Sequence, residues 1–330
     1  MLSRVADNLY WMSRYLERAE HTARLIDVNL YHLLDQKSEY AAQRWKRLYE
    51  SLRIPFPDRG MDDAYNVTQA LTFDATNASS IVSCITAARD NARQVREQIS
   101  TEMWEQLNRQ YLQMKKTNME DMWFSEPHEF LANLKEGVQL FQGIADATMS
   151  HNEGWHFIRV GRFIERAWAT AALLDVHFRG FTQRQEEITD SVQTDHLDYL
   201  EWVGLLRSCS AFEAYCKVYT ANIQPTRIAE FLLLNAEFPR SIRFSATMIQ
   251  NALQSIARET NARSTSRVER LAGRVRAALD YEQIEDIIGD IHAYLENIQQ
   301  QCMRIHDAIY QTYIFYPIGA ALTLEGAAQS

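Results

Sequence analysis

Apolar residues recur at alternating intervals of three and four along much of the chain. In a first long stripe they are Leu9, Met12, Leu16, Ala19, Ala23 and Ile26. In a second stripe they are Ile81, Ile85, Ala88, Ala92, Val95 and Ile99. This spacing places the apolar side chains on one face of an α-helix. The pattern therefore predicts amphipathic helices that each bury one face in a core.

Helix-breaking residues gather in a few short segments. They occupy residues 54–63, 116–127 and 237–239 and the surroundings of Pro225. Over the whole chain glycine (11 residues) and proline (6 residues) are scarce, a composition typical of long helices. We predict an all-α protein with about four to six helices in each half.

Two segments of the chain closely resemble each other. Residues 14–28 and 162–176 are identical at nine of fifteen aligned positions. The identities are Arg14/Arg162, Glu17/Glu165, Arg18/Arg166, Ala19/Ala167, Thr22/Thr170, Ala23/Ala171, Leu25/Leu173, Asp27/Asp175 and Val28/Val176. An internal repeat of this kind indicates a duplicated structural unit.

Further matches continue the alignment with an offset that grows slowly, as insertions in loops would cause. They include Trp45/Trp202, Leu48/Leu205, Ser51/Ser208, Ser80/Ser241 and Asp146/Asp307. We therefore predict two pseudo-symmetric helical-bundle repeats packed together, residues 1–150 and residues 151–317. Periodicity is lost after this point, so residues 318–330 are predicted to be a loosely ordered tail.

Charge and hydropathy narrow the possible surroundings of the protein. The net charge of −9 disfavours nucleic acid and anionic membranes as partners. No run reaches the roughly 18 apolar residues that a membrane-spanning helix needs. Residues 1–20 carry charges where a signal peptide would be apolar. The four cysteines are scattered and form no CxxC pair, so we predict a cytoplasmic protein with reduced thiols.

A Glu-Arg pair stands at the same place in both copies of the repeat. Neighbours on a helix point about 100° apart, so the two members cannot pair with each other and must serve different faces. One interpretation is an ionic network in each copy that fixes the register of the bundle. The other is a shared polar cleft in which arginines bind a carboxylate or a phosphate. The residues of that predicted binding site are Arg14, Glu17, Arg18, Arg162, Glu165 and Arg166.

A predicted helix start at residues 239–243 is a second candidate. Its backbone N–H groups could attract an anion, assisted by Arg240, Ser241 and Arg243. The competing interpretation is an ordinary helix start at which the serine is the N-cap. Residues 77–81 are its counterpart in the first copy.

Other chemistry finds little support in the sequence. A di-iron bundle needs two Glu-x-x-His motifs, and Glu153-x-x-His156 is a single instance. The aspartate-rich magnesium motif of isoprenoid synthases is matched loosely by Asp286-x-x-x-Asp290. Phosphate-binding loops, the GxSxG elbow and a Cys/His pair at a known spacing are absent. We predict no metal and no cofactor.

Several of these segments together resemble one known family. On RYLERAEHTARLID, FQGIADATMSHNEGWHFIRVGRFIERA and FLLLNAEFPRSIRFS, the chain resembles the alpha-E family along nearly its whole length. The resemblance places the family's Glu-Arg motif on Glu17, Arg18, Glu165 and Arg166, with Pro239, Arg240 and Ser241 as a secondary match. His151 departs from the family pattern, which has arginine there, and this weakens any role for a basic side chain at that position.

The resemblance also implies partners and a function. It implies association, by gene neighbourhood or fusion, with a circularly permuted ATP-grasp ligase and a transglutaminase-like protein that make or modify peptides. We expect a non-catalytic accessory subunit that binds the ligase or its peptide substrate. The alternative is an enzyme that acts on the peptide product through a Glu/Arg cleft, by transfer or hydrolysis. Turnover of that product by the chain alone would distinguish the two.

Overall fold

The computed structural model describes residues 1–35, 41–57, 63–187, 191–260 and 267–315. Within these residues the protein is all α, and no β-strand occurs. This confirms the predicted all-α class. The predicted tail, residues 318–330, lies outside the described residues.

The first half begins with a long helix and ends with another. Its helices are α1 (Ser3–Asp35), α2 (Ala41–Leu52), α3 (Ala64–Thr72), α4 (Ile81–Gln94), α5 (Thr101–Lys116), α6 (Met119–Phe124) and α7 (Pro127–Thr148). The predicted breaks at 54–63 and 116–127 separate α2 from α3 and α5 from α7. The second apolar stripe is not one helix, because Val95 leaves helical geometry and the 3₁₀ helix η2 (Arg96–Gln98) follows. That tighter turn still keeps Val95 and Ile99 buried.

A tight turn at residues 149–152 leads directly into the second half. Its helices are α8 (Glu153–Glu187), α9 (Ser191–Ser208), α10 (Phe212–Tyr219), α11 (Pro225–Leu234), α12 (Ile242–Glu259), α13 (Arg267–Tyr281), α14 (Ile284–Ile288) and α15 (Ile291–Ile309), followed by the π-helical turn η3 (Tyr310–Ile314). Pro225 starts α11, as its fixed φ and missing N–H favour.

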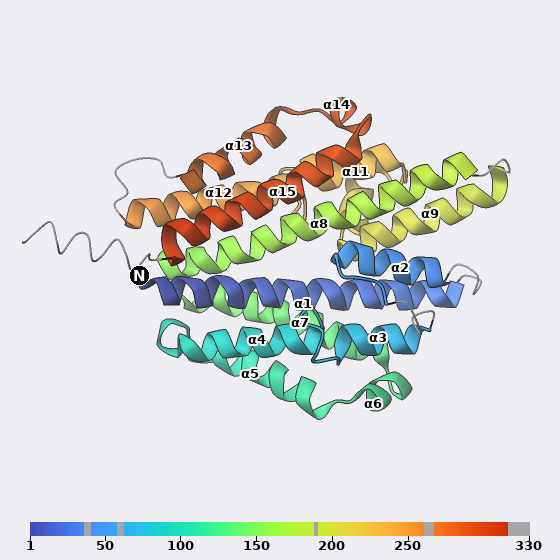
Figure 1. Cartoon of the computed structure of the whole chain (residues 1–330). Coiled ribbons are helices and arrows are strands. Elements are labelled where there is room, and N and C mark those ends of the chain that lie inside the picture. The colour runs from blue at the N-terminus through green and yellow to red at the C-terminus, as the bar shows by residue number, and fades with distance from the viewer. Residues whose placement is uncertain (36–40, 58–62, 188–190, 261–266, 316–330) are drawn as a thin grey trace, which may run out of the picture.

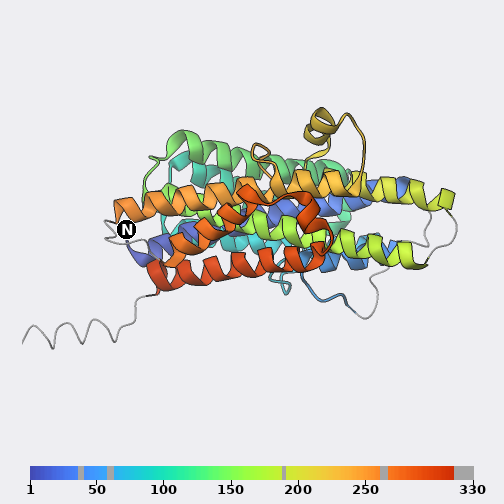
Figure 2. The same cartoon turned by 90° about the horizontal axis from the view of Figure 1, so that it is seen from above.

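Helices α1 and α8 lie side by side through the middle of the molecule (Figure 1). Helices α4 and α7 pack on α1, and α5 covers them. Helices α12 and α15 pack on α8, and α13 covers them. Helix α2 reaches across to α8, and α9 reaches across to α1. Seen from above, the bundle is elongated along the direction of α1 and α8 (Figure 2).

One hydrophobic core runs through both halves. The predicted stripe of α1 is buried along its whole length, from Leu9 to Ile26. It belongs to the same cluster as Leu173 of α8 and Leu253 of α12. Burial of this apolar surface supplies the main driving force for folding. No helix among the described residues combines the length and apolar character needed to cross a membrane.

Candidate functional site

The backbones of α1 and α8 come into contact at Gly161. A Cβ atom placed on Gly161 would lie 2.3 Å from the carbonyl oxygen of Tyr10 and 3.3 Å from Cβ of Ser13. A side chain does not fit at the shorter distance, so glycine lets the two helices lie this close. The two Glu-Arg motifs begin about one helical turn further along each helix. The contact therefore brings both motifs to the same interface.

Glu165 of α8 accepts hydrogen bonds from two arginines of α1. Nε of Arg14 donates to Oε2 at 2.7 Å, and Nε of Arg18 donates to Oε1 at 2.7 Å. The carboxylate is buried, with 3% of the side chain exposed. Each oxygen therefore has its own charged donor, as a buried carboxylate requires.

Glu17 of α1 is held in the same way from α8. Arg166 donates from Nε to Oε1 at 2.6 Å and from Nη2 to Oε2 at 2.9 Å. This two-pronged geometry is the strong form of the arginine–carboxylate pair. Gln142 of α7 donates a further hydrogen bond to Oε2 at 3.2 Å. Nη1 of Arg166 also donates to the backbone oxygen of Pro239, at 3.1 Å, and so secures the segment before α12.

The two motifs thus exchange partners across the α1–α8 interface. The glutamate of each motif pairs with the arginine of the other, Glu17 with Arg166 and Glu165 with Arg18. The expectation that neighbouring Glu and Arg serve different partners is met. Five of the six predicted residues, Arg162 excepted, come together in ion pairs between α1 and α8. We call this arrangement the reciprocal clasp.

More charged side chains extend the clasp on the Glu17 side. Arg240 donates from Nη2 to both oxygens of Glu20, at 2.9 and 3.0 Å, and Arg24 forms an ion pair with the same carboxylate. The cluster then contains six arginines and three glutamates: Arg14, Arg18, Arg24, Arg162, Arg166, Arg240, Glu17, Glu20 and Glu165. Its excess of positive charge lies in a largely buried place.

The surroundings keep both motif carboxylates ionised. Burial by itself would raise the pKa of Glu165, but Arg14 and Arg18 outweigh it and lower the pKa. The pKa of Glu17 is lowered too, because Arg166 and Arg240 outweigh its burial. Burial lowers the pKa of the neighbouring His21 to about 4, so this imidazole is neutral at pH 7.

Arg162 matches Arg14 in the repeat but lacks its partner. Its Nε is buried and makes no hydrogen bond within the described part of the chain. The guanidinium stands 4.7 Å from the ring centre of Phe163. Burial, followed by repulsion from Arg166, lowers the pKa of Arg162 to about 10. The cluster therefore contains a charge that weakens the folded state.

We predict that Arg162→Met makes the chain more stable by about 2 kcal/mol. The fall in the pKa of Arg162 from 12.5 to about 10 corresponds to about 3 kcal/mol at about 1.4 kcal/mol per unit, and partial contact of the side chain with solvent reduces this value. A basic group with a lowered pKa costs stability below that pKa, and the cost fades as the folded protein loses the proton. The gain should therefore be constant from about pH 6 to 9 and shrink above about pH 10. Urea unfolding at several pH values measures it. Arg93→Met, at an exposed position of α4, should change stability by less than about 0.5 kcal/mol. A loss of stability in Arg162→Met would show that its attraction to Glu17 dominates.

The second predicted site, at residues 239–243, is occupied by internal partners. Ser241 is the N-cap of α12 and accepts the N–H of Phe244 at 3.0 Å, the ordinary capping geometry. Ser80 caps α4 in the same way. The guanidinium of Arg240 lies on Glu17 and Glu20, and Nε of Arg243 donates to Asp280 at 2.9 Å. Their side chains thus turn to carboxylates of the protein.

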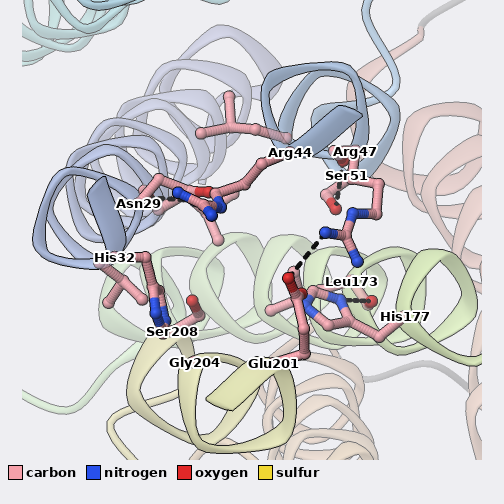
Figure 3. A pocket seen from close by; sticks show the side chains of 13 residues that line it. Asn29, His32, Arg44, Arg47, Ser51, Leu173, His177, Glu201, Gly204 and Ser208 are labelled. Carbon is pink, nitrogen blue, oxygen red and sulfur yellow. Dashed lines mark hydrogen bonds and ion pairs between the residues drawn. The ribbon is translucent and has the colours of Figure 1, made fainter. Parts of the chain in front are cut away.

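A small cavity between α1, α2, α8 and α9 was not singled out from the sequence. Figure 3 shows Arg44 and Arg47 of α2 on one side of it and Glu201 of α9 on the other. Nη2 of Arg47 donates to Oε1 of Glu201 at 2.8 Å. About 30 Å³ is left, room for one or two water molecules. Ser51 and Ser208, which are matched in the repeat, line the cavity. This match was the only feature of the sequence analysis above that pointed to these two residues.

Two larger hollows adjoin the matched aspartates Asp27 and Asp175. Asp27 forms an ion pair with Lys135 and a hydrogen bond with His128, beside a hollow of about 530 Å³. Asp175 is held by basic residues beside a hollow of about 650 Å³. The repeat marked both aspartates but not the basic residues around them. In the described part of the chain, no group of three or more His, Cys, Asp or Glu could hold a metal ion.

Comparison with known proteins identifies the family of this chain. Residues 1–314 match the Alpha-E model, described as a predicted alpha-helical domain with a conserved ER motif. Uncharacterized proteins of Mycobacterium bovis and of Mycobacterium tuberculosis (strain CDC 1551 / Oshkosh) are each 24% identical to the chain over 345 residues. The alignment covers 96% of this chain and 37% of each relative. No solved structure matches. With its helical fold and its two Glu-Arg motifs, the chain belongs to the Alpha-E family.

Proposed function

We propose that the chain is a non-catalytic partner subunit of a circularly permuted ATP-grasp peptide ligase, and that it binds the ligase or its peptide substrate. The observation that carries the proposal is the reciprocal clasp. Its ion pairs use the motif side chains to hold α1 against α8. Side chains that are already paired inside the protein favour a rigid binding subunit over an active site. The charged hollows beside Asp27 and Asp175 lie on such a subunit and offer polar surface to a partner.

The lengths of the mycobacterial relatives support a partner role. The chain spans 37% of each of these relatives, so the matching unit is covalently joined there to other segments. Covalent linkage keeps such a unit at a high effective concentration next to the segments to which it is joined. A transglutaminase-like protein is the second partner that we propose on the family resemblance.

The alternative function is an enzyme that transfers or hydrolyses the peptide product through a Glu/Arg cleft. A glutamate that exchanges protons in catalysis needs a pKa near the working pH. Their arginine partners hold the pKa values of Glu17 and Glu165 below the ordinary range instead. This favours the binding function over the catalytic one.

We further propose that the two halves are diverged copies related by an approximate twofold axis between α1 and α8. Three observations support this. The clasp joins matched residues in both directions, and the matched serines Ser80 and Ser241 both cap helices. Arg53 and Ser210, each two residues after a matched serine, both have a left-handed backbone, with φ of 55° and 48°.

A cytoplasmic location fits a system that consumes ATP. All four cysteines are free thiols, and three of them are buried. Proteins of reducing compartments keep their cysteines in this form. We therefore retain the cytoplasm as the proposed location.

The test of the proposed function uses the chain and an ATP-grasp ligase from the same organism, purified separately. We expect ATP-dependent amide formation only when the ligase is present, faster with the chain added, and no turnover of the product by the chain alone. Arg93→Gln, an exposed substitution remote from the clasp, should act like the wild type. Turnover by the chain alone would overthrow the accessory role in favour of the enzyme. An unchanged ligase rate together with no binding between the two proteins would exclude the partnership.

A further inference from the structure

The hollow beside Asp175 lies between α8 and α15. Arg53, which directly follows α2, completes its lining at one end. Its volume of about 650 Å³ is in the range of ligand sites. None of the residues that line it belongs to the reciprocal clasp.

A buried aspartate orients the basic side chains at this end of the hollow. Asp175 is fully buried, with 0% of its side chain exposed. Its Oδ2 accepts from Nη2 of Arg53 at 2.6 Å and from Arg179, and its Oδ1 bonds Nδ1 of His292. The three basic side chains stay 32%, 43% and 49% exposed. The buried carboxylate therefore fixes these three side chains in place, and each of them still contacts solvent.

Each of the two arginines keeps a donor for which no described residue is an acceptor. Arg53 uses Nε and Nη2 on Asp175 and Gln299, so Nη1 is left. Arg179 uses Nε and Nη2 on Asp175, which also leaves Nη1. An oxyanion offers several lone pairs and fits such converging donors.

The backbone at Arg53 ends helix α2 in a left-handed conformation. Its φ is 55°, in the left-handed region that glycine and asparagine adopt with less strain. This conformation ends α2 in the usual way, since the N–H groups of Arg53 and Ile54 donate to the carbonyl oxygens of Glu50 and Tyr49, at 3.0 and 3.1 Å. Arg53 therefore leaves the helix end at the position where its side chain lines the hollow.

The other residues that line the hollow indicate the length of the ligand and the character of its second end. Trp168 and Arg179 are eleven residues apart on α8, which is about 16 Å along the helix. Trp168 of α8 and Met303 of α15 are the apolar members of the lining, and Arg304 lies beside Met303. We propose that this hollow binds an elongated ligand with a carboxylate or phosphate group at one end. The oxyanion lies on Arg53 and Arg179, and the apolar part lies along Trp168 and Met303.

Calorimetric titration of the isolated chain tests the proposal with probes that share one tail. They are hexanoate, hexyl phosphate and hexanamide. We expect one or both of the anions to bind at least about tenfold more tightly than the amide, and the stronger of the two identifies the oxyanion. Equal affinity of the amide, or no binding by either anion, would overturn the proposal.

Two variants locate the site. Arg179→Gln should weaken binding of the preferred anion by about tenfold or more, and Arg304→Gln by about threefold. Arg304 is exposed on α15, so its variant should fold even if Arg179→Gln does not. Arg93→Gln on α4 is the control and should bind like the wild type. If Arg179→Gln folds and binds like the wild type, or if Arg304→Gln does so when Arg179→Gln does not fold, the ligand lies elsewhere. Because the titration contains no ligase, its result is separate from the outcome of the partnership test.

Discussion

A Glu165→Gln variant should be less stable than the wild-type chain by about 3–5 kcal/mol. The substitution keeps the size of the side chain but leaves Arg14 and Arg18 charged without their carboxylate in the α1–α8 interface. Removal of one member of a buried ion pair strands the other charge. Glu17→Gln should behave in the same way, because it strands Arg166. Urea unfolding followed by circular dichroism measures both.

The matched control is Glu105→Gln on an exposed face of α5, which should change stability by less than about 0.5 kcal/mol. The pH dependence supplies a second test. A carboxylate with a lowered pKa stabilises the fold above its ordinary value of 4.5, and this contribution is lost as the pH falls through the folded-state pKa. The gap between wild type and Glu165→Gln should therefore narrow in acid. Equal stability of the two at pH 7 would mean that the clasp does not hold the helices together.

Gly161→Ala should be destabilising by about 3 kcal/mol, at the upper end of the effect of overpacking. The added Cβ would lie 2.3 Å from the carbonyl oxygen of Tyr10, and a backbone atom cannot move aside as a side chain can. The helices must separate, and the clasp between Glu165 and Arg18 must lengthen with them. Urea unfolding of the variant gives the size of the effect.

Gly143→Ala on α7 is the matched control. Nothing lies within 4 Å of a Cβ at that position, and alanine favours a helix more than glycine does. This variant should be as stable as the wild type or more stable, by up to about 1 kcal/mol. If Gly161→Ala matched it, the close contact of α1 and α8 would not be needed for the fold.

The helices could be predicted from the sequence because their signals are local. The apolar stripe from Leu9 to Ile26 fixes which face of α1 is buried, and Pro225 marks where α11 starts. The cap at Ser241 was one of two interpretations, and it depends on local sequence because its side chain accepts the N–H of Phe244 three residues later. Val95 was misplaced within a helix, since a 3₁₀ turn can keep the same face buried after the helix ends.

The sequence by itself also determined that Glu17 and Arg18 must serve different partners, because neighbours on a helix point in different directions. Which partners they meet was decided only by the tertiary structure. Glu17 finds Arg166 through the crossing of α1 and α8 at Gly161, and Arg240 reaches the same carboxylate from the start of α12. Ion pairs between residues far apart in the chain depend on how helices pack, and hydrophobic periodicity shows which face is buried but not which helix covers it. For the same reason the donors around Asp175 appear only once α2, α8 and α15 are brought together.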